Sequence, residues 1–227
     1  MNQRRITRTT RTAIAAGLAA AAVSTAALAA PAQAGTSAGA HHAASAAKGE
    51  RSLATVLAKD SGFDKNLGDF DVLEAAVGAV LQAKPDSPLA AIADGSQRLT
   101  LFAPTDRAFV KLAKLLTGEQ PANEKQAFKA IAGAVDIDTL EQVLLYHVVP
   151  GATVNSKGVL AAAKERVNVT TAQGGTVGIR PNPAPVRLKD KDPDVPDPVA
   201  ITKLLDINKG NKQIAHGINR VLLPINL

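Results

Sequence analysis

In two segments of the chain, apolar residues recur three and four positions apart, the spacing of one face of a helix. The first opens with Asp71-Val-Leu-Glu74, a capping-box pattern in which the aspartate oxygen accepts from the amide three residues on, and it stops before Pro85. The second opens with the similar pattern Asp138-Thr-Leu-Glu141 and ends at Tyr146-His147, before Pro150-Gly151. The pattern predicts two amphipathic helices with aspartate caps.

A strand followed directly by a helix is predicted between these two segments. Leu99–Ala103 is an apolar run of strand length, and Pro104 breaks it. Thr105 or Asp106 is then placed to cap a helix with a leucine-rich face, which stops at Gly118.

The period changes from helix to strand in the last third of the chain. Val167–Thr171 and Thr176–Ile179 flank Gln173-Gly174-Gly175, which predicts a hairpin. Ala200–Leu205 and Gln213–Leu223 supply two further predicted strands. Helices followed by strands predict an α+β fold, a helical layer packed on a mostly antiparallel β-sheet wedge or sandwich.

The sequence divides into three regions. Residues 1–34 have a basic start, an alanine-rich apolar run and the cleavage box Ala32-Gln33-Ala34, which predict a secretory signal peptide. Residues 35–49, rich in Ala, Ser and Gly, predict a disordered leader. We expect residues 50–227 to form one domain with loop expansions near 84–97 and 181–198.

The second expansion is predicted to be exposed and semi-rigid. It contains six prolines in eighteen residues, and proline cannot pair in a central strand.

Charge argues against a nucleic-acid partner. The chain has 26 basic and 20 acidic side chains, but four of the arginines lie within the first 34 residues, which leaves 22 against 20. Nucleic-acid binding requires clustered positive charge. The chain has no cysteine, so its stability must come from the core. After signal cleavage we expect a secreted protein with no membrane span, since no second apolar stretch has the necessary length.

The sequence offers no complete catalytic or metal-ligand set. Hydrolysis needs an activated nucleophile, but the chain lacks a G-x-S-x-G elbow, and His216 lies in an apolar strand pattern that predicts a structural role. Asp190, Asp192, Asp194 and Asp197 alternate as in a calcium loop, yet the required glycine and glutamate are missing. We therefore expect a solvated acidic loop, no metal site and no cofactor.

Three stretches resemble the fasciclin domain family. They are Thr100-Leu-Phe-Ala-Pro-Thr-Asp-Arg-Ala-Phe109, Leu144-Leu-Tyr-His-Val-Val-Pro-Gly151 and His216-Gly-Ile-Asn-Arg-Val-Leu-Leu-Pro224, in the family's order. The resemblance implies a secreted, single-domain member of the bacterial type. It also implies a non-enzymatic adhesion or extracellular binding module whose partner is an extracellular protein, a cell-surface component or a matrix component.

The resemblance also implies a site. In animal fasciclin domains the Tyr-His region is associated with integrin binding, so Tyr146 and His147 are the candidate partner-binding residues. Apolar neighbours on both sides favour instead a tyrosine and a histidine packed at the helix end with satisfied polar tips. The alternative function is a carrier that holds a small apolar or lipid-like ligand in the crevice between helices and sheet.

Overall fold

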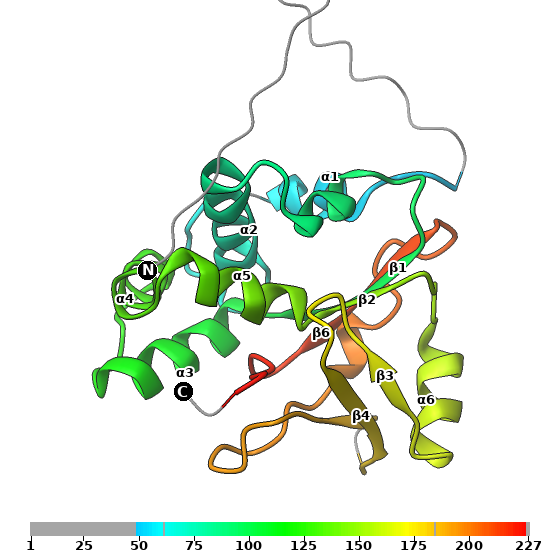
Figure 1. Cartoon of the computed structure of the whole chain (residues 1–227). Helices are drawn as coiled ribbons and strands as arrows, with labels where there is room; N and C mark the ends of the chain where they lie inside the picture. The colour runs from blue at the N-terminus through cyan, green and yellow to red at the C-terminus, as the bar shows by residue number, and fades with distance from the viewer. Residues whose placement is uncertain (1–48, 61, 184, 226–227) are drawn as a thin grey trace, which may run out of the picture. The chain divides into compact units, whose positions relative to one another are not determined.

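The computed structural model describes residues 49–60, 62–183 and 185–225 (Figure 1). The predicted signal peptide, residues 1–34, and all of the predicted leader except Gly49 lie outside the described residues.

The described residues form α-helices, short 3-10 helices and strands in alternation. The α-helices are α1 (Leu53–Leu57), α2 (Asp71–Ala83), α3 (Asp106–Thr117), α4 (Glu124–Ala134), α5 (Ile137–Leu145) and α6 (Ser156–Lys164). The 3-10 helices are η1 (Ala58–Asp60), η2 (Pro88–Ala93) and η3 (Thr202–Leu204). The strands are β1 (Leu99–Pro104), β2 (Val148–Pro150), β3 (Asn168–Thr170), β4 (Thr176–Pro181), β5 (Val186–Lys189) and β6 (Gln213–Ile218).

The strands form two three-stranded sheets. In the first, with order β2-β1-β6, the central strand β1 runs antiparallel to β2 and parallel to β6, with Leu99 opposite both Pro150 and Gln213. In the second, with order β3-β4-β5, both pairings are antiparallel. The α+β prediction with mostly antiparallel pairing is confirmed, and the parallel β1–β6 pair is the exception.

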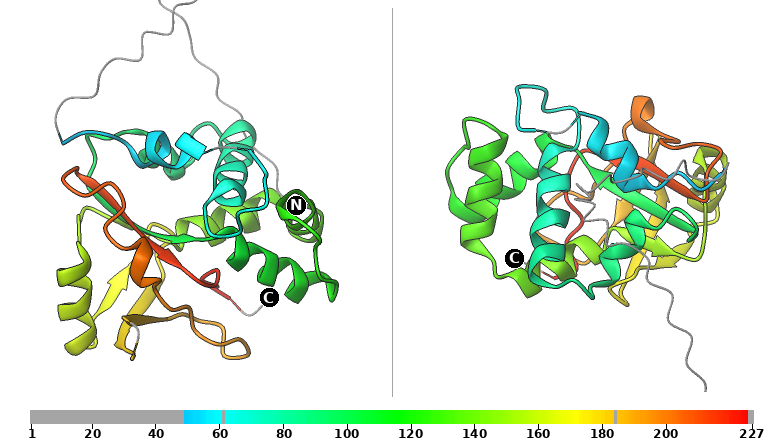
Figure 2. Two further views of the ribbon diagram at one scale, coloured as in Figure 1. Left: turned by 180° about the vertical axis from the view of Figure 1, so that it is seen from behind. Right: turned by 90° about the horizontal axis from the view of Figure 1, so that it is seen from above.

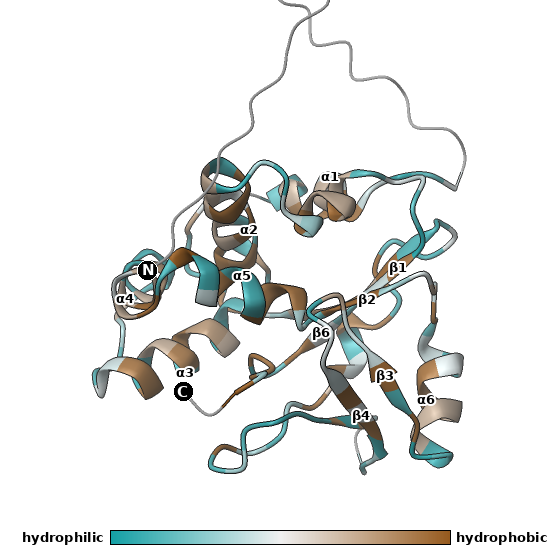
Figure 3. Cartoon of the chain, in the orientation of Figure 1, coloured by the Kyte–Doolittle hydropathy of each residue, from teal (hydrophilic) through white to brown (hydrophobic). Residues whose placement is uncertain are grey.

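Strand β1 separates two hydrophobic cores because its side chains alternate between faces. Leu99, Leu101 and Ala103 enter the larger core, which also holds apolar side chains of α1 to α5, whereas Phe102 enters the smaller core. The smaller core lies among β4, β5 and α6 and includes Tyr146. Figures 2 and 3 show α2 to α5 grouped on one side of the first sheet and the apolar colours gathered on the central strands.

The predicted caps of α2 and α3 are wrong, because the two helix starts cap each other. Asp71 is the first residue of α2 and does not cap it; the Asp106 carboxylate accepts from the backbone N–H of Asp71 at 3.2 Å and of Val72 at 2.7 Å. Thr105 precedes α3 without a side-chain cap, and the first amides of α3, Asp106 and Arg107, donate to the carbonyls of Asp69 and Leu67. Partners distant in sequence have replaced the local ones.

The predicted cap of α5 is also wrong. Asp136 caps the helix by accepting from the backbone N–H of Thr139 at 2.6 Å. Asp138 and Glu141 instead both pair with Lys84, at the end of α2. Two carboxylates on one helix face are thus used to join helices and not to begin one.

One expected loop and one expected strand differ from the elements that the structure shows. The expanded segment 181–198 contains strand β5, where Val186 and Leu188 are buried, so the expectation of an exposed loop is wrong there. The flanking prolines leave the pairing of β5 with β4 intact, and the other side of β5 bonds to residues 198–200. The predicted strand Ala200–Leu205 is wrong, since only Ala200 forms a bridge, with Ile218, before η3 begins.

Candidate functional site

Tyr146 and His147 lie at the end of α5 and are fully buried. The Tyr146 hydroxyl donates to the backbone carbonyl of Thr176 at 2.7 Å. The tyrosine ring also lies 3.0 Å from where a Cβ at Gly175 would stand, so it leaves little room for a side chain at that position of the hairpin. Neither side chain reaches the surface. The partner contact that the resemblance implies for Tyr146 and His147 stays a prediction.

Both ring nitrogens of His147 bond backbone atoms. The backbone N–H of Leu222 donates to Nε2 at 2.8 Å, so Nε2 is unprotonated and Nδ1 donates to the carbonyl of Val143 at 2.7 Å. Burial lowers the pKa of His147 to about 4. The neutral ring therefore links α5 to the segment that follows β6.

His216 is bonded in a similar way. Its Nε2 bonds the carbonyl of Val154 at 2.8 Å, and the backbone N–H of Asp206 donates to Nδ1 at 3.3 Å. The pKa of His216 is lowered, chiefly by burial. As the sequence predicted, the ring ties the strand to neighbouring backbone. With both nitrogens engaged, neither His147 nor His216 is placed to act as a general base.

The proline-rich acidic segment is folded by its own carboxylates. Asp190 accepts from the backbone N–H of Leu223 at 3.0 Å, and Asp192, which is buried, accepts from those of Asp194 and Val195 at 2.7 and 3.2 Å. Burial raises the pKa of Asp190 to about 6. The expectation of a solvated acidic loop is therefore wrong for Asp190 and Asp192.

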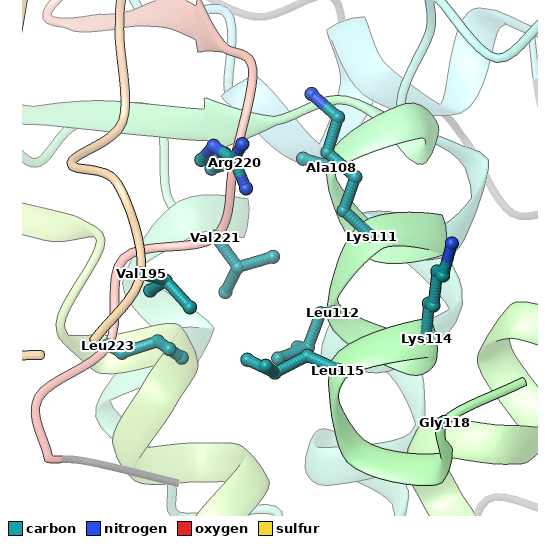
Figure 4. Close-up of a pocket in the computed structure, with 10 residues that line it drawn as sticks. All are labelled: Ala108, Lys111, Leu112, Lys114, Leu115, Gly118, Val195, Arg220, Val221 and Leu223. Carbon is teal, nitrogen blue, oxygen red and sulfur yellow. The ribbon is translucent and has the colours of Figure 1, made fainter.

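A groove of about 460 Å³ opens between α3 and the segment that follows β6 (Figure 4). We call it the α3 groove. Its apolar lining faces across the gap and comprises Ala108, Leu112, Leu115, Val195, Val221 and Leu223. Leu115 is 46% exposed, one of the few large apolar side chains left open to solvent in the described part of the chain.

Basic side chains lie beside this apolar lining. Lys111 stands on α3 and Arg220 on the opposite wall, while Lys114 extends from the side of α3 that is turned away from the gap (Figure 4). Lys111 donates to the carbonyl of Asn219 at 2.9 Å, and its pKa is lowered by burial and then by the positive charges of Arg220 and Arg107. Among the described residues, Lys114 and Arg220 form no ion pair. The α3 groove is thus apolar inside and positive at its edge.

A second cavity, of about 290 Å³, lies between helices and the first sheet. Its walls are almost wholly apolar and come from α1, α2, η2 and β1, through residues such as Leu57, Val77, Ile92 and Leu101.

Sequence reasoning missed the α3 groove. The helical spacing of Lys111, Lys114 and Leu115 is the only local signal for it, because Arg220 lies more than a hundred residues further along. A leucine in such a pattern is normally predicted to face a core.

Across the part of the chain that the structure describes, no helix combines the length and hydropathy of a membrane span.

A solved structure of a FAS1 domain pair from the insect cell adhesion molecule fasciclin I is similar, with a TM-score of 0.47 and 16% identity. The match covers 65% of this chain and 45% of that one, so the chain spans less than half the length of the insect structure. No curated protein sequence matches the chain. The family model of the fasciclin domain matches residues 72–224, well over half of the sequence. The chain therefore belongs to the fasciclin domain family.

Proposed function

We propose that this chain is a secreted, non-enzymatic adhesion module that holds its partner in the α3 groove. Fasciclin domains are typically extracellular adhesion modules and are generally non-enzymatic. The observation that carries the proposal is the exposed apolar lining of the groove, with Lys111, Lys114 and Arg220 beside it. The partner is an extracellular, cell-surface or matrix protein that presents an apolar side chain beside carboxylates.

The chemistry of the groove supports this partner. Burying Leu115 against an apolar side chain removes exposed hydrocarbon from water, which favours association in proportion to the area covered. Carboxylates on the partner would complement the unpaired charges of Lys114 and Arg220 and accelerate the encounter. We therefore expect binding that weakens as salt concentration rises.

His147 has an indirect part in this proposal. Its Nε2 accepts from the backbone N–H of Leu222, whose neighbours Val221 and Leu223 form one wall of the α3 groove. The histidine is thus a positioning residue for the groove wall. In this role the buried His147 would affect partner binding without touching the partner.

Attachment of cells and isolated extracellular matrix to surfaces coated with the chain tests the proposal. Leu115→Asp and Arg220→Glu should each weaken attachment by about tenfold or more, while melting temperature stays unchanged. Matched controls lie on other helices: Leu160→Asp on α6, where the leucine is 40% exposed, and Lys125→Glu on α4. Attachment that falls equally in the controls, or not at all in the groove variants, would rule out the α3 groove.

The carrier alternative rests on the second cavity, whose apolar walls suit a small apolar ligand. Solvent extraction of the purified chain followed by mass spectrometry distinguishes the two functions. A lipid-like molecule released in stoichiometric amount, and lost after Val77→Trp fills the cavity, favours the carrier. An empty chain that still attaches cells favours the adhesion module.

A further inference from the structure

Five carboxylates gather where three helices begin. Asp71, Asp106 and Glu124 are the first residues of α2, α3 and α4, and Asp64 and Asp69 come from the segment that leads into α2. Side-chain oxygens of Asp64, Asp71 and Glu124 lie within 4.8 Å of one another, and so do those of Asp69, Asp106 and Glu124. We call this set the helix-start cluster, and Glu124 is common to both of its halves.

Four oxygens of the helix-start cluster are shielded from water and have no hydrogen-bond donor among the described residues. They are both carboxylate oxygens of Asp69, Oδ1 of Asp71 and Oε1 of Glu124. Glu124 is 0% exposed and Asp71 is 5% exposed. Buried polar atoms in folded proteins almost always have a partner, because an unpaired acceptor loses its water without compensation.

Backbone groups fix the cluster in place while leaving those four oxygens open. Both oxygens of Asp106 are occupied as the cap of α2, and Oε2 of Glu124 accepts from the backbone N–H of Asp64 at 2.7 Å. The carboxylates are therefore held close together by contacts with backbone N–H groups.

The described residues give the helix-start cluster no ion-pair partner. The partial positive charges of three helix starts offset part of the repulsion. They do not supply donors to the four open oxygens, because the first amides of α2 and α3 already donate to Asp106 and to backbone carbonyls.

We propose that the helix-start cluster binds a calcium ion. All of its side-chain ligands are carboxylate oxygens, the donors that a hard divalent cation prefers. Ca²⁺ binds oxygens at about 2.3–2.6 Å, so two ligands on opposite sides of the ion are separated by about 5 Å. The mutual separations within 4.8 Å fit that limit. Asp64, a member of one half of the cluster, is exposed to solvent.

The ion would connect three segments that lie far apart in the sequence. It would connect the segment before α2 to the first turns of α3 and α4 through Asp69, Asp106 and Glu124. Since the ion binds the folded chain and not the unfolded one, calcium should raise the melting temperature until the site is saturated.

The test uses the full chain after chelator treatment and dialysis, with CaCl₂ as the probe and NaCl of equal ionic strength as the reference. We expect saturable heat by isothermal titration calorimetry with a dissociation constant of about 1 mM or below, and a parallel rise in melting temperature. MgCl₂ should act at least about tenfold more weakly, because Mg²⁺ requires shorter bonds and stricter octahedral geometry.

Variants locate the site. Glu124→Gln and Asp69→Asn should each weaken calcium binding by at least about tenfold, whereas Asp197→Asn in the proline-rich segment should leave it unchanged. If Glu124→Gln does not fold, Asp69→Asn and the wild-type calorimetry still decide the matter. The absence of both a calcium heat and a calcium-dependent rise in melting temperature in the wild type would overturn the proposal. Equal calcium binding by wild type and Asp69→Asn would overturn it by placing the ion elsewhere.

Discussion

Two buried polar regions of this molecule are built in opposite ways. At the end of α5, the hydroxyl of Tyr146 and both ring nitrogens of His147 have backbone partners. In the helix-start cluster, four carboxylate oxygens have none among the described residues. Both regions are therefore buried, and they differ in the pairing of their polar atoms. Paired polar groups stabilise the fold, whereas unpaired ones are available to a ligand.

The difference has a chemical origin. A neutral histidine carries one donor and one acceptor, so two backbone groups satisfy it completely. An ionised carboxylate only accepts, and several of them placed together need donors or positive charge from outside the group. The predictions below test this contrast from each side.

The largest effect is expected at the fully paired histidine. His147→Ala leaves the carbonyl of Val143 and the N–H of Leu222 without partners and opens space in the core. The free energy of unfolding should fall by about 4 kcal/mol. Denaturant unfolding measures this change. A loss below about 1 kcal/mol would mean that water or side-chain movement replaces both bonds.

The same histidine should make stability depend on pH. Its pKa is about 4 in the folded chain, against about 6.5 when unfolded, so the unfolded state takes up the proton first as pH falls. The stabilisation is complete above pH 6.5 and is lost between about pH 6.5 and 4, with a total of about 3 kcal/mol.

Comparison with His147→Gln isolates this dependence. Acids whose pKa is raised by burial act in the opposite direction, because the folded state then binds the proton first. Asp71 and Asp190, each with a pKa of about 6, are of this kind. They are present in both proteins, so the difference between the two pH profiles belongs to His147. Parallel profiles would contradict a buried neutral ring.

Sequence patterns predicted those elements whose signals are local. The helices beginning near Asp71, Asp106 and Asp138 were found because their apolar residues recur on one face, and the hairpin around Gly174 was found from its glycines. The alternation of β1 between two cores and its parallel pairing with β6 were not predicted, because a strand that is buried on both faces shows no alternation of polar and apolar residues.

The sites were harder to predict than the elements. Asp71 and Asp106 were assigned as local caps, while the structure uses Asp106 on the neighbouring helix and leaves Asp71 with an open oxygen. The helix-start cluster spans residues 64 to 124, so no sequence window contains it. The sequence pattern from Asp190 to Asp197 resembles a calcium loop more closely, although backbone amides donate to its buried carboxylates in the structure.

The smallest effect is expected when an aspartate is replaced by alanine in each of the two regions, with both variants measured in chelator-treated protein. Asp192→Ala removes an acceptor for the N–H groups of Asp194 and Val195, so it should lower the free energy of unfolding by about 1–2 kcal/mol. Asp69→Ala removes two open oxygens from among like charges and should raise it by up to about 1 kcal/mol. Denaturant titrations of both variants against wild type measure the difference.

One outcome would contradict the contrast between the two regions. If Asp69→Ala also destabilises the calcium-free chain, its carboxylate already has a partner, such as a proton shared with Asp106. A second outcome would support the calcium site. If Asp69→Ala is more stable than wild type without calcium but less stable than wild type with calcium, then the unpaired oxygens destabilise the calcium-free chain and stabilise the calcium-bound one.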